Sequence, residues 1–244
     1  ASARYWEQLP QLEKASQTFG VPKNYLMALW GMESSFGYYQ GSYDVLSVLA
    51  TLAFDGRRES LFSKEFIAAM KMLQRDHIER HKMRGSWAGA MGQTQFMPSS
   101  YLRYAADGNG DGEKNIWTEH YDVFASIANY LHTEGWNPNL PWGVEVTVNQ
   151  PIDMTLSGTE EGKQRRLTDW QNRGVSLKFQ TPETQQKLTA LSQADLWLVR
   201  PDRELGRAFL VSNNYRTLLH WNKSNYFAVS IGMFADRIQQ RIGN

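Results

Sequence analysis

The stretch GSWAGAMGQTQFMPSSYLRYAADGNGDGEKNIW, residues 85–117, is the most informative part of this chain. Its first part surrounds Gln93, Gln95 and Phe96 with small residues, and it is too rich in Gly and Ala to be an ordinary amphipathic helix. Its second part, DGNGDG, places oxygen ligands at alternate positions with a glycine at the sixth, as in loops that turn around a hard cation such as Ca²⁺. A polar wall beside a metal-braced loop predicts a binding site for a long, hydroxylated ligand.

The metal loop departs from the usual twelve-residue calcium loop at its end. Positions 1, 3, 5 and 7 are supplied by Asp107, Asn109, Asp111 and the Glu113 backbone carbonyl. Position 12 usually holds a bidentate Glu, but Thr118 stands there. We therefore expect weak to moderate Ca²⁺ affinity, with sodium as an alternative occupant, and a structural role in pinning the segment after Tyr101. An Asx-rich turn without a metal is the competing interpretation.

Composition excludes several functional classes. The 244 residues are 41% hydrophobic, which suits one large domain or two small ones with a substantial core. The net charge is +1, and the 26 Lys and Arg residues are scattered among 25 Asp and Glu residues, so a nucleic-acid partner is not expected. There are no cysteines, which excludes disulfides, thiolate nucleophiles and thiolate metal sites. No apolar run is long enough to span a bilayer.

Aromatic residues make up 13% of the chain, including nine Trp. A fraction this high predicts that some rings are exposed, where they offer flat apolar faces to sugar rings or to protein partners. A Trp-rich core is the alternative. The chain starts inside ASARYWEQLP, without a Met or a signal sequence, so we interpret it as processed or truncated, with any targeting or lipid-attachment segment outside it.

Periodicity divides the chain into helical and strand-like parts. Helices are predicted over 3–18, 23–35, 44–54, 59–81, 121–135 and 224–241. Residues 143–213 alternate apolar and polar positions with β-branched side chains, which predicts short strands. We therefore expect a helical body at 1–142, a β-rich subdomain at 143–213 and a C-terminal helix at 214–244 that returns to the core.

Glu33 is the leading candidate for chemistry. It lies at the end of an apolar helix, near Leu29, Trp30 and Met32, which could desolvate its carboxyl. A carboxyl in an apolar pocket has a raised pKa and stays protonated near neutral pH, as a general acid must. Taken alone the signal is weak, because most Glu residues at helix ends are solvated.

Five blocks resemble the signature of one family, in the same order. They are GMESSFG (31–37), GSWAGAMGQTQFMPSSY (85–101), DGNGDG (107–112), SIANYL (126–131) and LHWNKSNYFAVSIG (219–232). The family is the bacterial lytic murein transglycosylases of the membrane-bound lytic transglycosylase B type. The likeness covers the chain from about residue 20 to the C-terminus, and the second block is long and specific. It implies an α+β fold, mainly α, with a goose-type lysozyme-like helical core and an added α domain, both contained in the helical body at 1–142, and a small β-rich subdomain.

The resemblance also implies a reaction. Such enzymes cleave the β-1,4 bond between N-acetylmuramic acid and N-acetylglucosamine in peptidoglycan, and the muramic acid C6 hydroxyl closes a 1,6-anhydro ring. The residue matching the family's single catalytic acid and base is Glu33. No cofactor is needed for this chemistry. The resemblance implies that peptidoglycan glycan strands are the main partner and that cell-wall synthases are candidate partners. It also implies a monomer in the bacterial periplasm. Anchoring to the outer membrane, through a segment outside this sequence, is a further candidate property.

Other site residues are implied by motif matching. Ser86 is expected to hydrogen-bond near Glu33 and to hold its orientation. Gln95 and Phe96 are expected to contact sugars through amide hydrogen bonds and ring stacking. Tyr130 would line the cleft near the reacting ring. The packing or capping of each residue is the competing interpretation.

The last block adds Asn222 and Tyr226 as substrate contacts. It departs from the family at Trp221, where a Tyr is usual, so a hydroxyl hydrogen bond at that point is in doubt.

The family's metal loop is longer than a standard one, and its closing ligand matches Asp122, with Glu119 as the alternative.

One carboxylate is enough for this reaction. Ordinary glycosidases use two carboxylates, but no second one in the matching blocks takes that role. A nucleophile within the substrate lets one carboxyl act first as acid and then as base, and avoids the entropy of recruiting water, worth up to roughly 7–11 kcal/mol. Two alternatives stay open: a hydrolytic muramidase, and a non-catalytic peptidoglycan-binding scaffold.

Overall fold

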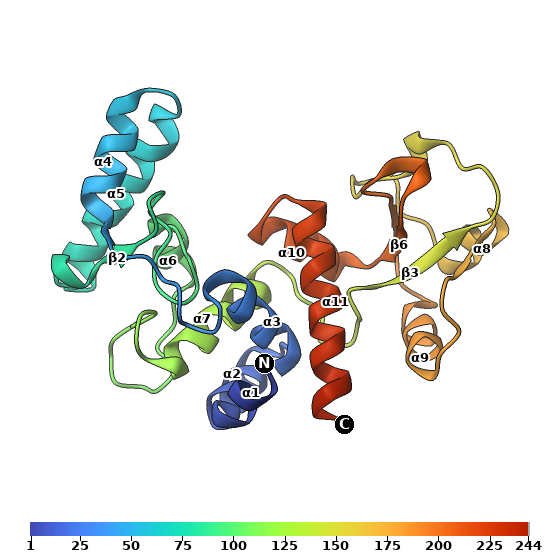
Figure 1. The fold of residues 1–244 in the computed structure, drawn as a ribbon, viewed down its shortest axis with the longest axis horizontal. Helices are drawn as coiled ribbons and strands as arrows, with labels where there is room; N and C mark the ends of the chain where they lie inside the picture. The colour runs from blue at the N-terminus through green and yellow to red at the C-terminus, as the bar shows by residue number, and fades with distance from the viewer. Residues whose placement is uncertain (244) are drawn as a thin grey trace. The chain divides into compact units, whose positions relative to one another are not determined.

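The computed structural model describes residues 1–243, and helices dominate it (Figure 1). The chain forms two compact units, Ala1–Thr133 with Phe234–Asn244, and Glu134–Met233. The second boundary falls inside α11 (Asn225–Ile242). The predicted class, α+β and mainly α, is confirmed. None of the helices within residues 1–243 combines the length and the apolar character needed to cross a membrane.

The first unit holds most of the helices. They are α1 (Ser2–Glu7), α2 (Leu9–Phe19), α3 (Lys23–Ser34), α4 (Val45–Asp55), α5 (Glu59–Arg75), α6 (Pro98–Tyr104) and α7 (His120–Thr133). The predicted single helix over 3–18 is wrong, because the chain breaks at Gln8. Pro10 explains the break, since it lacks an N–H and its ring clashes with the carbonyl four residues earlier. The helix predicted over 59–81 is also too long: α5 ends at Arg75, and His77 has a positive φ of 53°.

Helix α3 forms the centre of the first unit. Residues Tyr25–Trp30 are all buried, so this helix is apolar around most of its circumference. The Trp30 ring packs edge-on against Phe124 of α7, with 4.9 Å between ring centroids. Helices α4 and α5 form an antiparallel hairpin (Figure 1). Glu65 of α5 ties this hairpin to α6, because its carboxylate accepts hydrogen bonds from the N–H and hydroxyl of Ser99.

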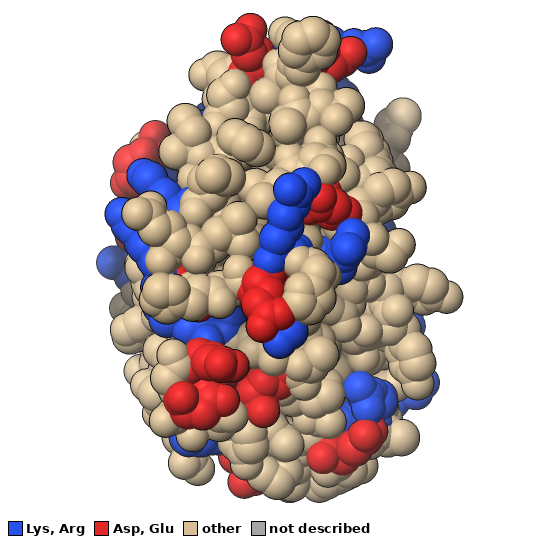
Figure 2. All heavy atoms as spheres, turned by 90° about the vertical axis from the view of Figure 1, so that its left-hand side faces the viewer, with Lys and Arg blue, Asp and Glu red and all other residues tan. Residues whose placement is uncertain are grey.

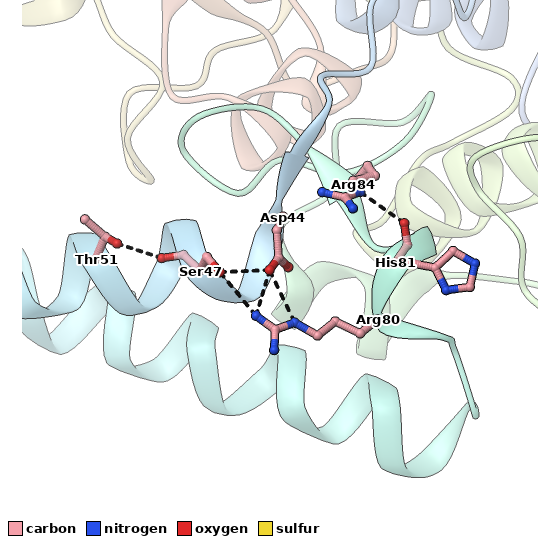
Figure 3. Close-up of polar contacts among 6 residues, drawn as sticks. All are labelled: Asp44, Ser47, Thr51, Arg80, His81 and Arg84. Carbon is pink, nitrogen blue, oxygen red and sulfur yellow. Dashed lines mark hydrogen bonds and ion pairs between the residues drawn. The ribbon is translucent and has the colours of Figure 1, made fainter.

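A polar clamp lies at the base of this hairpin, where β1 (Tyr43–Asp44) pairs antiparallel with β2 (Arg84–Gly85). The Arg80 guanidinium donates to the Asp44 carboxylate at 2.7 Å and to the Ser47 hydroxyl at 3.2 Å (Figure 3). The Arg84 Nε donates to the His81 carbonyl. The hydrogen bond from Arg80 is the main cause that lowers the pKa of Asp44. The clamp fixes the strand that precedes α4 against the strand that leads into the 85–96 loop.

The second unit is built on a four-stranded antiparallel sheet in the order β4-β3-β6-β5. Its strands are β3 (Gly143–Val148), β4 (Val175–Leu177), β5 (Trp197–Val199) and β6 (Ala208–Val211). Buried side chains from the sheet pack with Trp170 and Leu191 into one core. The strands predicted within 143–213 are confirmed. The domain limits 142/143 and 213/214 stay a proposal beside the boundaries at 133/134 and 233/234.

Helices α8 (Leu167–Asn172), α9 (Pro182–Leu191) and α10 (Asn213–Trp221) were not predicted. The start of α9 carries a capping box, in which the hydroxyl of Thr181 accepts from the N–H of Thr184 and the hydroxyl of Thr184 accepts from the N–H of Thr181. The six-residue α8 is stabilised by packing, because Trp170 is fully buried and its indole N–H donates to the Leu196 carbonyl at 3.0 Å.

Candidate functional site

Glu33 lies in the last turn of α3 and is partly buried. Of the three residues predicted to desolvate it, Leu29 and Trp30 are fully buried, whereas Met32 is exposed. The carboxyl-bearing turn therefore has one apolar, packed side and one side open to solvent. This is an environment from which an acid can reach a ligand while its backbone stays fixed.

A hydrogen-bonded relay fixes the turn of α3 that precedes Glu33. The Trp30 indole N–H donates to Gln93 Oε1 at 2.8 Å, and Gln93 Nε2 donates to the Trp117 carbonyl at 2.9 Å. Gln93 is buried, so the relay is shielded from water. It joins the helix of Glu33 to Gln93 within the 85–117 stretch and to Trp117 at the end of that stretch. Gln93 was not among the predicted site residues, although its place in the run of small residues was a signal.

The chain leaves α3 through three successive residues in the left-handed region. The φ angles of Ser35, Phe36 and Gly37 are 49°, 62° and 88°. The Ser34 hydroxyl accepts from the Gly37 N–H at 3.0 Å, which closes the turn. Only glycine fits at position 37, because a Cβ there would lie 2.6 Å from Gln93 Oε1. The non-glycine positive φ angles store backbone strain directly after Glu33.

The 85–96 segment is a closed loop rather than a helix. Gly85 bridges to Met91, and Met91 bridges to Phe96, each in the antiparallel sense. Within it, the Ser86 hydroxyl accepts from the N–H groups of Ala88 and Ala90 at 3.2 and 3.1 Å. Ser86 thus shapes the turn that follows β2. Its predicted role in orienting Glu33 stays a prediction.

Gln95, Phe96 and Tyr130 sit in different surroundings from one another. Gln95 has a φ of 55°, and its Nε2 donates to the carbonyls of Gln40 and Gly92. Phe96 and Tyr130 are buried, with ring centroids 6.1 Å apart. Gln95 therefore holds the 37–41 segment against the 92–95 turn, and the two rings form an aromatic layer behind it. Their predicted sugar contacts stay predictions.

Asn222 and Tyr226 belong to the second unit. Asn222 ends α10, and its side-chain oxygen accepts from the Ser224 N–H at 3.1 Å. Tyr226 is exposed, and its hydroxyl donates to Asp202 at 2.5 Å, which raises the pKa of the phenol. Both residues are accessible, as a substrate contact requires, and their roles stay predictions.

The 107–122 loop brings carboxylates together. Oxygens of Asp107, Asp111 and Asp122 lie within 4.8 Å of one another. Asp122 is buried, and its two oxygens accept from the N–H groups of Gly108 and Asn115 at 2.7 and 2.8 Å. The predicted alternative Glu119 instead accepts from the Tyr121 N–H at the start of α7.

The donor set fits a hard cation. Oxygens 4.8 Å apart or closer can share one Ca²⁺, which takes oxygen ligands at about 2.3–2.6 Å. Burial is the main cause that raises the pKa of Asp122, while hydrogen bonds from the Gly112 and Gly110 amides lower the pKa of Asp107. A cation would relieve the cost of keeping the Asp122 charge buried. Asn109 and Glu113 lie in the same loop, the latter donating its N–H to Asp111 at 2.8 Å.

The charged side chains form no broad patch of one sign on the face shown in Figure 2. Lys and Arg are mixed there with Asp and Glu, and wide areas between them carry neither. An open groove along α5 has a more basic lining. Its charged lining residues are four cations and one acid, namely Arg57, Arg58, Lys64, Lys71 and Glu59. A surface of this kind suits an uncharged or weakly charged ligand better than a polyanion.

Comparison with known proteins gives a consistent picture. The profile of one protein family, described as "Transglycosylase SLT domain", matches residues 1–236. The chain is 33% identical over 230 residues to membrane-bound lytic murein transglycosylase B of Escherichia coli (strain K12), covering 93% of this chain and 60% of that protein.

Solved structures agree with this. SltB3 from Pseudomonas aeruginosa, in complex with NAG-anhNAM-pentapeptide, matches with a TM-score of 0.87 and 37% identity, over 97% of this chain and 62% of that one. The Escherichia coli lytic transglycosylase SLT35, in complex with calcium, matches with a TM-score of 0.78 and 27% identity, over 97% of this chain and 72% of that one. The chain thus spans 60% and 62% of the first two proteins.

Proposed function

The chain belongs to the transglycosylase SLT domain family, and on that premise we propose that it is a lytic transglycosylase of peptidoglycan. It would cleave the β-1,4 bond between N-acetylmuramic acid and N-acetylglucosamine and form a 1,6-anhydromuramic acid end. The observation that carries the proposal is the placement of Glu33, partly buried at the end of a helix whose last turns are locked to the 85–117 stretch. The anhydro sugar in the complex of the relative SltB3 supports the same product.

The chemistry follows from a single carboxyl. Glu33, as the acid, gives its proton to the glycosidic oxygen while the bond from that oxygen to the anomeric carbon breaks. The resulting oxocarbenium-like centre is attacked by the C6 hydroxyl of the same muramic acid. The Glu33 carboxylate then takes the hydroxyl proton, so the acid is regenerated and no water is consumed. The Trp30–Gln93–Trp117 relay fixes the helix turn that carries Glu33, and this favours one position of the carboxyl through both steps.

The remaining site residues enter the proposal as substrate contacts. Ser86 lies in the turn that follows β2, Gln95 is bonded to the segment that follows α3, and Phe96 packs with Tyr130. Asn222 and Tyr226, both exposed residues of the second unit, are proposed as further contacts to the glycan. We place the reaction in the bacterial periplasm, where the substrate lies, with the chain acting as a monomer and cell-wall synthases as candidate partners.

A structural cation is part of the proposal. Asp107, Asn109, Asp111, the Glu113 carbonyl and Asp122 would hold Ca²⁺, with Na⁺ as the alternative, and the calcium complex of SLT35 supports this. When bound, the ion supplies charge compensation and rigidity, not chemistry. The Tyr101 hydroxyl donates to the Lys114 carbonyl at 2.8 Å, so α6 is anchored to the same loop that would hold the ion.

The decisive experiment is mass spectrometry of fragments released from purified peptidoglycan sacculi. The parent chain is expected to release anhydromuropeptides and the Glu33→Gln variant none, whereas Glu59→Gln, which changes an exposed acid in the first turn of α5, should behave like the parent. Products one water heavier would identify a hydrolytic muramidase. No release by the parent, together with retention on sacculi, would identify a binding scaffold instead.

A further inference from the structure

Four exposed aromatic residues surround the Glu33 turn and the Ser86 loop without contributing to the core. Their side chains are large and apolar, yet 78%, 75%, 56% and 69% of the surface is exposed for Tyr38, Tyr39, Tyr43 and Trp87. Three of them fall within ten residues of Glu33, and Trp87 directly follows Ser86. Several exposed rings on two adjacent backbone segments need an explanation, because exposed apolar surface of this kind typically marks a binding surface.

The backbone that carries these rings is held rigidly. Gln40 Nε2 donates to the carbonyls of Gly37 and Trp117, and Gln95 Nε2 donates to the Gln40 carbonyl at 3.1 Å. The Tyr39 N–H donates to the Ser34 carbonyl at 2.9 Å, which continues the turn that follows α3. The two tyrosines therefore project from a loop that several hydrogen bonds attach to the rest of the first unit.

Tyr43 and Trp87 are brought together by strand pairing. Tyr43 on β1 is the direct partner of Gly85 on β2, and Trp87 stands two residues further, at the corner of a turn closed by the bond from the Gly89 N–H to the Ser86 carbonyl. The approach is close, because a Cβ on Gly41 would lie 2.1 Å from the Gly85 carbonyl oxygen. The Asp44–Arg80 clamp fixes the same strand from its other side (Figure 3).

We infer that Tyr38, Tyr39, Tyr43 and Trp87 form an aromatic platform that binds pyranose rings of the glycan strand outside the sugars at the cleaved bond. This rests on the proposed function for the identity of the ligand. The platform is continuous with the candidate site through Ser34–Gly37 and Gly85–Ser86. Residues 34–43 contain no Asp, Glu, Lys or Arg, so the segment is neutral, which matches neutral sugar rings better than acidic peptides.

Ring chemistry supports this ligand class. A pyranose has an apolar face of C–H groups and a rim of hydroxyls, and an aromatic ring meets the face while a phenol or amide meets the rim. Rigid presentation lowers the entropy lost on binding, because neither the loop nor the strand must be ordered first. Because the platform lies outside the sugars that react, it binds substrate and transition state equally. It should therefore raise the affinity for long strands and leave the rate of the chemical step unchanged.

Binding to the intact but inactive chain provides the test. In a Glu33→Gln background, affinity is measured by calorimetry for peptide-free glycan strands and for a single disaccharide unit. The Tyr38→Ala/Tyr39→Ala pair and Trp87→Ala should each weaken strand binding by about tenfold or more and leave disaccharide binding nearly unchanged. The Tyr→Phe pair, which keeps both rings, should stay within about twofold of the background.

A matched control comes from Phe54, which is 94% exposed and lies at the C-terminal end of α4, the end away from Tyr43. Phe54→Ala should bind strands like the background. Unchanged strand affinity in the alanine variants, or an equal loss in Phe54→Ala, would overturn the platform. In the active chain the alanine variants should raise KM with kcat retained. The binding measurements do not depend on catalysis. If the parent chain formed no anhydro product, the proposed function would be wrong, but the measured affinities would still show whether the platform binds glycan strands.

Discussion

The site loops of the first unit and the sheet of the second unit are stabilised in different ways. In the sheet, backbone groups pair with one another along the ladder, and side chains such as Val146 and Leu210 pack into an apolar core. In the 34–43 and 85–96 loops, amide and hydroxyl side chains satisfy the backbone instead, as Gln40, Gln93 and Gln95 do. The sheet should therefore be sensitive to lost volume, and the loops to lost hydrogen bonds.

The largest expected effect is on the sheet. Trp170→Ala would leave a cavity in the core of the second unit and remove the hydrogen bond to the Leu196 carbonyl, at a cost of about 3–5 kcal/mol in the free energy of unfolding. Urea denaturation followed by circular dichroism measures this. Phe179→Ala, an exposed ring of the same unit, should change the midpoint little. Equal effects of the two variants would show that burial does not govern stability there.

The second effect is on the loops. Gln93→Leu leaves the Trp30 indole N–H without its acceptor, while the Trp117 carbonyl keeps the hydrogen bond from Gln40, and the buried unsatisfied donor costs about 1–3 kcal/mol. Because the relay fixes the helix of Glu33, kcat on sacculi should fall much further than stability accounts for, with KM little changed. Gln74→Leu, at an exposed position of α5, serves as the control. If the Gln93→Leu chain kept the kcat of the parent, the relay would have no role in positioning Glu33 for catalysis.

A third effect concerns calcium and pH. Burial raises the pKa of Asp122, so the folded chain without metal binds more protons than the unfolded chain, and its stability falls as pH rises through that pKa. Ca²⁺ binds the ionised carboxylate of Asp122, so it offsets the loss of stability that ionisation of this buried group causes. The gain in thermal midpoint on adding Ca²⁺ should therefore be large at neutral pH and vanish in acid. Scanning calorimetry with Ca²⁺ or a chelator measures it, and Asp122→Asn should lose most of the gain at every pH.

The smallest effect is expected at the Asp44–Arg80 clamp, because the Arg80 side chain is largely exposed to solvent and salt and the Asp44 side chain is partly exposed. The pKa of Asp44 is lowered in the folded chain, so its contribution is present above the unfolded pKa and is lost as pH falls through the folded one. Arg80→Gln should lower the thermal midpoint slightly at neutral pH and not in strong acid. A thermal-shift series in pH and salt checks this. An unchanged difference at high salt would contradict the electrostatic interpretation.

The regular parts of the chain were largely predictable from sequence. Alternation over 143–148 gave β3, and the apolar run around Leu29 gave α3 within a residue of its observed end. The errors come from local chemistry that competes with periodicity. Pro10 divides the first helix, and the Thr181–Thr184 capping box starts a helix that apolar spacing does not reveal, since α9 has one buried residue, Leu191.

The site was predictable only in part. Glu33 alone looked like a solvated helix-end residue, and the family resemblance singled it out. The role of Gln93 was out of reach, because its partner Trp30 lies 63 residues away and no local pattern encodes that contact. The same holds for the exposed tyrosines: composition predicted that some rings face solvent, but not that hydrogen bonds from Gln40 and Gln95 would fix the loop that carries them.

The Gln93 relay also has a consequence for how this protein ages. Hydrolysis of a glutamine amide replaces its NH₂ group with a second oxygen, and at this position that oxygen would face the Trp117 carbonyl, which now receives a hydrogen bond at 2.9 Å. Two acceptors would then oppose each other in a buried place, and a negative charge would stand beside the turn that carries Glu33. Its burial keeps water away from the amide, so the fold that depends on Gln93 also slows the hydrolysis of that side chain.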